Sequence, residues 1–391
     1  MSVPLADGSA TLMPDAVRSA PAARLRRLTI RDFRNLAAVT LELPDSGLAF
    51  VGDNGHGKTN LLEAVYYLHL FRSMRGARDR ELVRFGAAAF HVAASAEGTR
   101  WQQVGAGFER ETGRRRIILD GVPCPRVGDA LGAVPSVAFS PADVSLVAGG
   151  PGGRRQWLDV VLASTSPRYL AALREYRAAL AQRNAALRAR TRSSPPHVWD
   201  VPLAMHGAAL TISRAAFLTW GTPLAAQYSD DLGERGTLEL RYRTGESLPP
   251  GATEDEVRDG IASALHASRE RDLERGVTHH GPHRDDVDLR LSGVSLRRYG
   301  SAGQQRTAAI ALRLLECAWH REHGGREPLL LLDDPVAELD RRRAARVLEL
   351  LTDEAAGQVL LAVPRDDDIP SALTALPRRR VRDGAVEPGD A

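Results

Sequence analysis

Hydrophobic and polar positions alternate along residues 24–30 and again along 38–43, and this period of two predicts a pair of β-strands. A Pro-Asp-Ser-Gly turn follows, and the uninterrupted apolar run at 48–51 then predicts a buried strand. Apolar residues over 61–70 predict a helix, and short alternating segments between 87 and 119 predict antiparallel strands. The first third of the chain therefore predicts an α/β fold.

The middle third is predicted to be helical. Apolar residues recur at spacings of three and four from residue 167 to 187 and again from 199 to 224, which is typical of amphipathic helices. A short Ser/Pro-rich break separates the two, so we expect an antiparallel helix hairpin whose aromatic residues pack in the core. A strand at 238–242 and a helix opening at the capping box of Thr253 and Glu256 complete this segment.

The last third returns to the α/β pattern. Alternating residues 287–291 predict a strand, and residues 307–319 predict a long helix. The apolar runs at 328–332 and 358–363 predict two buried strands.

These changes of pattern predict the domain organisation. Residues 24–143 and 278–391 form one discontinuous lobe, and residues 144–277 form an inserted helical arm with a hinge-like glycine-rich breaker at 149–153. Residues 1–23 are rich in Ala, Pro and Ser without any period, so we expect a disordered tail there.

The strand at 48–51 leads directly into a loop with the spacing of a phosphate-binding site, Gly52-x-x-x-x-Gly57-Lys58-Thr59, and a helix follows. Glycines let backbone N–H groups converge on an anion, Lys58 would reach the terminal phosphates, and the Thr59 hydroxyl would hold Mg²⁺. The nucleotide-binding candidates are Gly52, Asp53, Asn54, Gly55, His56, Gly57, Lys58, Thr59 and Asn60. The expected cofactors are ATP and Mg²⁺.

Lys58 is also the only lysine among the 52 Lys and Arg residues of the chain. Every other cation is an arginine, whose planar guanidinium cannot replace a compact ammonium in a crowded phosphate cradle. This use of lysine at one position supports the phosphate-loop interpretation over a chance glycine-rich turn.

Two acids end the apolar run at 328–332. Asp333 and Asp334 could not be buried in the middle of a core, so we expect them at the carboxyl end of the strand, where a ligand lies. Asp333 fits the Mg²⁺-site acid that completes the shell of Thr59, and Asp334 fits the group that orients or deprotonates an attacking water. Lys58 and Asp334 are therefore the candidate catalytic residues.

A second candidate phosphate contact precedes the helix at 307–319. The segment Gly300-Ser-Ala-Gly-Gln-Gln-Arg306 places small residues and a serine at a helix N-terminus, where backbone donors and the helix dipole favour an anion. Such helix starts are common, so the segment alone does not establish a phosphate site.

Charge and clustered polar residues leave several readings open. The net charge of +3 is compatible with nucleic-acid binding but does not establish it. The basic run from Arg72 to Arg84 and the triplet at 114–116 fit either a solvated surface or phosphate contacts. The His and Asp residues at 278–286 are too closely spaced to favour a metal site.

Cysteine content and hydropathy indicate the compartment. Cys124 and Cys317 are far apart and have no metal-ligand spacing, which fits a reduced, cytoplasmic setting. We find no signal peptide and no apolar run approaching the roughly 18–20 residues of a membrane span, so we expect no membrane partner.

The order of phosphate loop, inserted arm, glycine–serine helix start and acidic strand resembles the ATP-binding-cassette heads of DNA-repair and chromosome-organising ATPases. About 270 residues separate Thr59 from the acids. From about residue 24 to about 385, the chain most closely resembles the RecF family. The segments that carry the resemblance are Phe33–Leu36, Gly52–Ala64, Arg72–Arg75, Pro151–Arg155, Tyr176 with Gln182–Asn184, Gly281–Asp286, Gly300–Arg306 and Leu331–Asp340.

The resemblance implies an ATPase head with a helical arm and an ATP-dependent homodimer that clamps DNA at gaps or junctions. It also implies that RecO and RecR are partners in loading RecA, and that ATP hydrolysis is slow. Ser301 and Gly303 would touch the γ-phosphate of the other copy, Gln304 and Arg306 would anchor that loop, and Asp340 would lie at the dimer contact.

Some positions depart from the family pattern. Pro335 follows the two acids, Pro364 follows the strand at 358–363 where a His or Thr sensor is usual, and Ser140–Asp143 lacks the glutamine common in cassette ATPases. A transporter ATPase subunit and a chromosome-organising or nuclease-partner ATPase stay open as alternatives. The arm argues against the first, and its length of about 130 residues argues against the second. A metabolite kinase is a weaker alternative.

Overall fold

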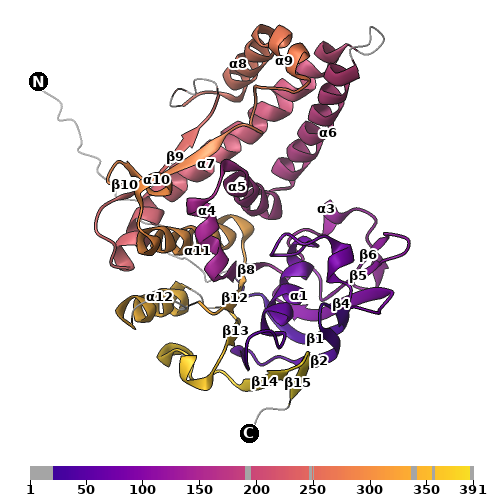
Figure 1. The fold of residues 1–391 in the computed structure, drawn as a ribbon, viewed down its shortest axis with the longest axis vertical. Coiled ribbons are helices and arrows are strands. Elements are labelled where there is room, and N and C mark those ends of the chain that lie inside the picture. Colours follow the sequence, from indigo (N-terminus) through magenta and orange to yellow (C-terminus); the bar gives the residue numbers. More distant parts are fainter. Residues whose placement is uncertain are drawn as a thin grey trace, which may run out of the picture.

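The computed structural model describes residues 21–189, 195–245, 249, 251–335, 341–354 and 357–387. The strands in these ranges form three sheets. Figure 1 shows two of the sheets in a lower, rounded part of the molecule, from which an elongated, mainly helical arm extends upward.

The first sheet is antiparallel and has six strands. Their order is β2 (Leu36–Glu42), β1 (Arg24–Phe33), β4 (Ala89–Glu97), β5 (Gln103–Glu109), β6 (Arg115–Leu119) and β7 (Val122–Pro123). The strands predicted at 24–30, 38–43 and 87–119 are therefore confirmed. They belong, however, to a different sheet from the strand that leads into the phosphate loop.

The second sheet contains that strand and is largely parallel. Its order is β15 (Ala385–Glu387), β14 (Arg378–Arg382), β3 (Gly47–Val51), β13 (Val359–Val363), β12 (Leu329–Asp333) and β8 (Ser136–Phe139). Only the β14–β15 pair is antiparallel among these described strands. The parallel order brings the carboxyl ends of β3, β12 and β13 to one edge, where ligands bind in such sheets.

Both faces of the second sheet are buried, as the continuous apolar runs require. Leu48 and Phe50 of β3 point into a core shared with the first sheet, whereas Ala49 and Val51 point into a core shared with the arm. Helix α1 (Lys58–Leu70) fills the first of these cores and contacts strands of both six-stranded sheets. The phosphate loop is thereby fixed to the rigid centre of the molecule.

The arm contains the predicted helix hairpin. Helix α6 (Pro167–Ala189) packs against α7 (Asp200–Asp231), and α7 also packs against α8 (Glu254–Ala267) and α11 (Ala302–Gly324). Phe217 is fully buried and packs edge-on against Trp157, so this part of the aromatic stripe is core as predicted. The capping box of Thr253 and Glu256 is confirmed at the start of α8.

A third, antiparallel sheet joins the arm to the returning chain. Strand β9 (Leu238–Arg243) pairs with β10 (Asp286–Leu291), which also pairs with β11 (Val294–Ser295). The predicted boundary between residues 277 and 278 therefore separates two partners of one sheet. The division into lobe and arm stays a prediction.

The remaining described elements are short or flank these layers. They are α2 (Asp79–Leu82), α3 (Val127–Ala130), η1 (Pro141–Asp143), α4 (Val144–Ala148), α5 (Pro151–Thr165), η2 (Pro196–Trp199), α9 (Arg269–Arg275), α10 (Leu296–Tyr299), α12 (Arg341–Glu354), η3 (Asp366–Asp368) and η4 (Ser371–Leu373).

Three sequence predictions need correction. The hinge at 149–153 is wrong beyond Gly150, because Pro151 opens α5 and its fixed φ suits a first helical turn. Helix α11 begins at Ala302, five residues earlier than predicted, since Ser301 and Gln304 form a capping box. Residues 1–20 of the predicted tail lie outside the described residues, whereas Ala23 is buried and donates its backbone N–H to Glu327 O at 3.0 Å.

By length and composition alone, the stretch Pro196–Asp231 could cross a membrane. Half of its apolar window is buried inside the molecule, and core helices of soluble proteins pass the same test. The contacts of α7 with α6, α8 and α11 account for its apolar character without a bilayer.

Candidate functional site

The phosphate loop has the backbone that its glycines predict. Gly55 and Gly57 have φ angles of 86° and 112°, a region that suits glycine. A Cβ on Gly57 would lie 2.7 Å from Asn35 Oδ1, so any other residue there would have to displace the Asn35 side chain as well as adopt a strained φ. Helix α1 begins at Lys58, three residues before the predicted start at residue 61, and follows the loop directly.

The Lys58 ammonium is held over the loop by the chain itself. Its Nζ donates to the carbonyl oxygens of Gly52 at 2.5 Å and of Asp53 at 2.9 Å. Burial lowers the pKa of Lys58 from its ordinary value, although the carboxylates of Asp333, Asp334 and Asp53 oppose this shift. The side chain is therefore positioned by neutral acceptors and keeps its charge available to an anion.

The predicted magnesium ligands meet across the sheet. The Thr59 hydroxyl donates to Asp333 Oδ1 at 2.8 Å, although 274 positions separate the two residues. Burial raises the pKa of Asp333 above its ordinary value, while the hydrogen bond from Thr59 opposes the shift. Two oxygen donors side by side at the end of a strand match the hard-ligand chemistry of Mg²⁺.

Asp334 follows at the end of β12. Its φ of 48° lies in the left-handed region, and its backbone N–H donates to Ala362 O at 2.9 Å. This conformation turns the residue out of the strand and into the cavity beside the phosphate loop. The placement fits the predicted role next to a reacting phosphate.

These residues line one cavity of about 310 Å³. Its lining consists of Asn54, Gly55, Gly57, Lys58, Thr59, Asn60, Arg75, Pro141, Asp333, Asp334, Ala362 and Pro364. The departures at Pro141 and Pro364 therefore both lie at the cavity. Neither side chain offers a polar group to a phosphate.

The His56 ring is held outside this cavity. The backbone N–H of Asp383 donates to His56 Nδ1 at 3.0 Å, and that of Gly384 donates to the His56 carbonyl oxygen at 2.9 Å. The turn of the β14–β15 hairpin thus supports the phosphate loop from behind. His56 therefore links the phosphate loop to the β14–β15 turn, a role that the sequence pattern does not predict.

Sequence reasoning did not assign Arg75 and Glu63 to the site. Arg75 donates to Asn60 Oδ1 at 2.5 Å and to Glu63, which also accepts hydrogen bonds from Arg34 at 2.9 Å and Ser73 at 2.5 Å. Glu63 is fully buried. Burial alone would raise the pKa of Glu63, but the hydrogen bonds from Arg75, Arg34 and Ser73 hold it below its usual value.

This network joins two segments that look unrelated in the sequence, Phe33–Leu36 and Arg72–Arg75. The basic run that begins at Arg72 was the sequence feature that could have placed Arg75 at the site, because contact with phosphates was one of its two interpretations. The structure brings Arg75 to the cavity, whereas Arg84 pairs with Asp32 at 2.6 Å.

The glycine–serine segment lies elsewhere. Ser301 caps α11, accepts from the Gln304 N–H at 3.2 Å and is exposed, while the Arg306 side chain is buried. A Cβ on Gly303 would lie 2.8 Å from a guanidinium nitrogen of Arg343. The lining of the phosphate-loop cavity includes none of Ser301, Gly303, Gln304 and Arg306. Asp340 lies outside the described residues.

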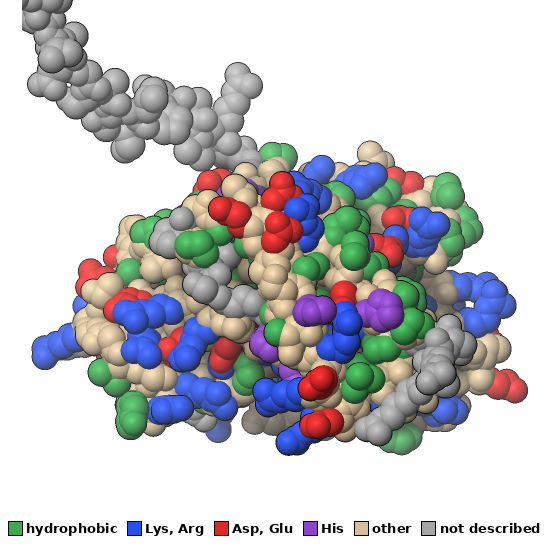
Figure 2. Space-filling model, turned by 90° about the horizontal axis from the view of Figure 1, so that it is seen from above, with side chains coloured by type: hydrophobic (Ala, Val, Ile, Leu, Met, Phe, Trp, Pro, Cys, Tyr) green, Lys and Arg blue, Asp and Glu red, His purple; other side chains and the backbone are tan. Residues whose placement is uncertain are grey.

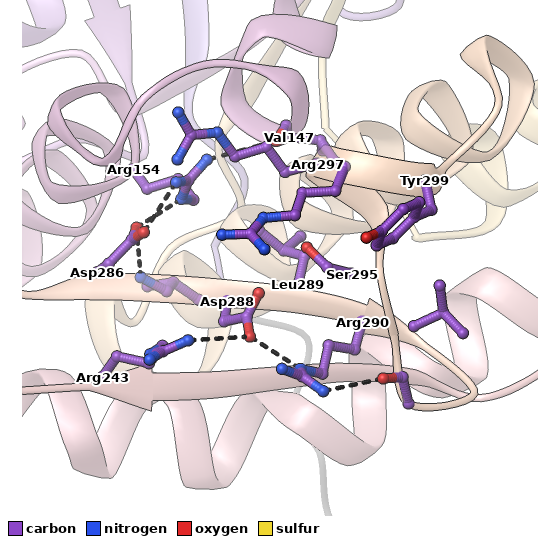
Figure 3. A pocket seen from close by; sticks show the side chains of 14 residues that line it. Val147, Arg154, Arg243, Asp286, Asp288, Leu289, Arg290, Ser295, Arg297 and Tyr299 are labelled. Atoms are coloured by element: carbon purple, nitrogen blue, oxygen red, sulfur yellow. Dashed lines mark hydrogen bonds and ion pairs between the residues drawn. The ribbon is translucent and has the colours of Figure 1, made fainter.

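A second cavity, of about 520 Å³, lies next to this segment (Figure 3). Arg154 is almost fully buried and donates to both carboxylate oxygens of Asp286, at 2.7 and 3.0 Å. Asp288 lies 2.8 Å from Arg290 and 3.7 Å from Arg243. Figure 3 shows these pairs holding α5 and strands β9 and β10 around the cavity, so much of its charge is used internally.

The histidine cluster at 278–286 is also used internally. His279 Nδ1 lies 2.7 Å from Asp272 Oδ1, and His283 Nδ1 lies 2.6 Å from the Tyr176 hydroxyl. In the described part of the chain, no group of three or more His, Cys, Asp or Glu side chains is arranged to hold a metal ion.

Comparison with curated proteins finds relatives along most of the chain. The DNA replication and repair protein RecF of Synechococcus sp. (strain JA-2-3B'a(2-13)) is 40% identical over 341 residues, which span 84% of this chain and 88% of the relative. That of Chloroflexus aurantiacus (strain ATCC 29364 / DSM 637 / Y-400-fl) is 35% identical over 395 residues, which span 93% and 100%. A scan against protein-family models found no matching model.

Solved structures agree with the sequence comparison. A structure of the recombination mediator protein RecF with ATP, in the RecFOR pathway, has a TM-score of 0.85 and 28% identity, and covers 94% of this chain and 99% of that one. The Smc head bound to the C-winged helix domain of ScpA has a TM-score of 0.53 at 14% identity over 93% and 96%, which shows the fold alone. The predicted ATPase-head fold is confirmed, and the chain belongs to the RecF family of DNA replication and repair proteins.

Proposed function

We propose that this chain binds ATP in the cavity at the end of β12 and acts as an ATP-controlled DNA clamp. One observation carries the proposal: Lys58 and Thr59 share a cavity with Asp333 and Asp334, which lie far away in the sequence. The similar RecF structure with ATP supports ATP as the nucleotide. Thr59 and Asp333 would hold Mg²⁺, which would neutralise charge on the phosphates.

The exposed segment at Ser301 supports a homodimer. Helix N-termini attract anions, yet Ser301, Gly303, Gln304 and Arg306 do not line the cavity of their own chain. In the proposed dimer, Ser301 and Gly303 contact the γ-phosphate bound by the other copy, Gln304 and Arg306 anchor the loop, and Asp340 lies at the contact. ATP then bridges the two copies only while its γ-phosphate remains.

DNA is the proposed partner of the closed dimer, with gaps or junctions between single and double strands as the preferred form. RecO and RecR are the proposed protein partners, and loading of RecA is the proposed outcome in the cytoplasm. Kinship with curated DNA replication and repair proteins supports this assignment. Contacts to the phosphate backbone would make binding sensitive to salt and weakly selective for sequence.

Hydrolysis is proposed to be slow and to open the clamp. Pro364 supplies no polar sensor group at the cavity, and Asp334, which also lines it, is the residue proposed to orient or deprotonate water. We expect Asp334→Asn to keep ATP binding but to lower hydrolysis by about 100-fold or more, since general bases typically contribute that much. Phosphate release measured with and without DNA checks this. An unchanged rate would remove Asp334 from the mechanism.

The whole proposal is tested by anisotropy of labelled gapped DNA with ATP, with ADP and without nucleotide, together with sedimentation of the same mixtures. We expect DNA binding that requires ATP and follows a shift from monomer to dimer. ATP binding without dimerisation or DNA affinity would contradict the clamp and favour a stand-alone ATPase.

A further inference from the structure

The first sheet has one covered face and one open face. Along β4, Val92 and Ala94 are buried against the core, whereas His91 and Ala93 point to the other side. Two adjoining hollows, of about 360 and 310 Å³, lie on that outer side and share His91, Gly105 and Ile118. In Figure 1, strands β4, β5 and β6 lie at the right-hand edge of the molecule, away from the tip of the arm.

Strand pairing arranges the outer side chains in rows across the sheet. One row runs from Arg31 through His91 and Gly107 to Arg116. The next runs from Thr29 through Ala93 and Gly105 to Ile118. With strands about 4.8 Å apart, the backbones of Arg31 and Arg116 are about 14 Å from each other. The floor between them consists of His91 and Gly107 in one row and of Ala93 and Gly105 in the next.

The long side chains at the two ends of this floor are cationic. Arg31, Arg114 and Arg116 are exposed, and within the described ranges no ion pair involves them. Arg27 lies 3.4 Å from Glu42, but both side chains are more than half exposed, so water screens this pair. The surface formed by Arg27, Arg31, Arg114 and Arg116 is called the basic sheet face below.

The glycine at the centre of the face is not required by the fold. The φ of Gly105 is not in the left-handed region, and a Cβ there would make only ordinary contacts, 3.7 Å to His91 Nε2 and 3.8 Å to Ala93 Cβ. Glycine inside a strand weakens it and often marks a place where a ligand approaches the backbone. At Gly105 it keeps the floor of the basic sheet face low.

We propose that the basic sheet face binds the sugar–phosphate backbone of DNA. The inference rests on the proposed DNA clamp and assigns its contact surface. Arginines around a shallow floor suit the phosphates of a duplex, which need cations and close approach but no deep pocket. A protein partner would instead need aromatic or aliphatic anchors to bury. Ile118 is 39% exposed here, whereas Phe90 and Phe108, which also line one hollow, already pack in or against the core.

The surface seen from above carries mixed charges: in the coloured part of Figure 2, acidic, basic and histidine side chains are intermingled. The basic sheet face has four arginines, with Glu109 as the acid that lines its hollows. Charge complementarity to a polyanion therefore favours the sheet.

The test uses the full chain with ATP and labelled gapped DNA over a series of salt concentrations. We expect Arg31→Glu with Arg116→Glu to weaken binding about tenfold or more, and to reduce the slope of log affinity against log salt by about two, one for each lost phosphate contact. The charge-matched control is Arg168→Glu with Arg174→Glu on α6, where both side chains are exposed. The control should leave the salt slope unchanged.

Two further variants protect the test against misfolding. Arg31→Gln with Arg116→Gln removes the charges without adding acids, and Gly105→Glu places one carboxylate in the floor at a position where a Cβ fits. All variants should bind ATP as the wild type does. Normal DNA affinity and salt slope in the charge variants would overturn this inference while leaving the clamp intact. A wild type that binds no DNA would overturn both.

Discussion

The phosphate loop and the glycine–serine segment both present backbone donors at a helix start, but their surroundings differ. At the phosphate loop, Lys58, Thr59 and Asp333 are held by hydrogen bonds within the chain. At the other segment, Ser301 exchanges hydrogen bonds with Gln304, and this exposed residue does not line the cavity. Folding assembles the phosphate-loop half of the proposed site, and we propose that the glycine–serine segment completes the site of another copy.

The two regions are nevertheless connected inside the molecule. Asp143, which follows β8 near the cavity, lies 2.6 Å from Arg313 on α11, the helix that Ser301 caps. His69 on α1 and His320 on α11 pack edge-on with ring centroids 5.5 Å apart. These contacts tie the side of the molecule that carries the phosphate-loop cavity to α11.

The largest effect on ATP affinity should come from a substitution in the phosphate loop. Lys58→Ala removes the ammonium beside the loop, and we expect ATP affinity to fall by about 100-fold or more, because a lost buried charge contact costs several kcal/mol. Titration with a fluorescent ATP analogue measures this. Lys58→Arg is the informative control: it keeps the charge but should also bind poorly, since the guanidinium is too large for the cradle. Full binding by Lys58→Arg would contradict this geometry.

A substitution in the glycine–serine segment should affect dimerisation and leave ATP binding largely unchanged. Ser301→Arg adds a bulky cation at an exposed position outside the cavity, so we expect ATP affinity within about threefold of wild type, less than 1 kcal/mol. Sedimentation with ATP should then show monomers only. Ser301→Ala, which removes the cap without adding bulk, is the matched control for helix stability. ATP-dependent dimers of Ser301→Arg would refute a role in trans.

The comparison also shows where sequence reasoning succeeds. The loop from Gly52 to Thr59 and the two acids at the end of β12 were predictable because each has a local pattern with a chemical meaning. The contacts of Glu63 with Arg34 and Arg75 were not, because they depend on how α1 packs between two sheets. The pairing of β9 with β10 was missed for the same reason, since alternation predicts strands but not their partners.

Acid should lower the stability of the folded chain, because His69 and His320 are buried where α1 meets α11. Burial lowers the pKa of His320 to about 4, and burial with the nearby His320 lowers that of His69 well below its ordinary value. In the unfolded chain both rings titrate near 6.5, so between pH 6.5 and about 4 the unfolded state binds more protons. We therefore expect stability to be full above pH 6.5 and to fall by about 2 kcal/mol at pH 5 through His320, with a further loss in the same direction through His69.

Denaturant unfolding at several pH values measures this loss. His320→Phe keeps an aromatic ring against His69 but cannot be protonated, so it should reduce the dependence on pH below 6.5. A variant whose stability falls with acid as steeply as that of the wild type would exclude His320 as a source of the effect.

The smallest effect is expected at His56, which lies within the phosphate loop but contacts the C-terminal hairpin. His56→Ala loses one hydrogen bond from the Asp383 N–H, so stability should fall by only about 0.5–1 kcal/mol. ATP affinity should change less than about threefold, less than 1 kcal/mol, because the ring does not line the cavity. Asp383→Asn is the control, since the donor there is a backbone group and stays in place. A large loss of ATP affinity in His56→Ala alone would show that the ring turns toward the nucleotide when it binds, and would make the hairpin contact a feature of the empty loop only.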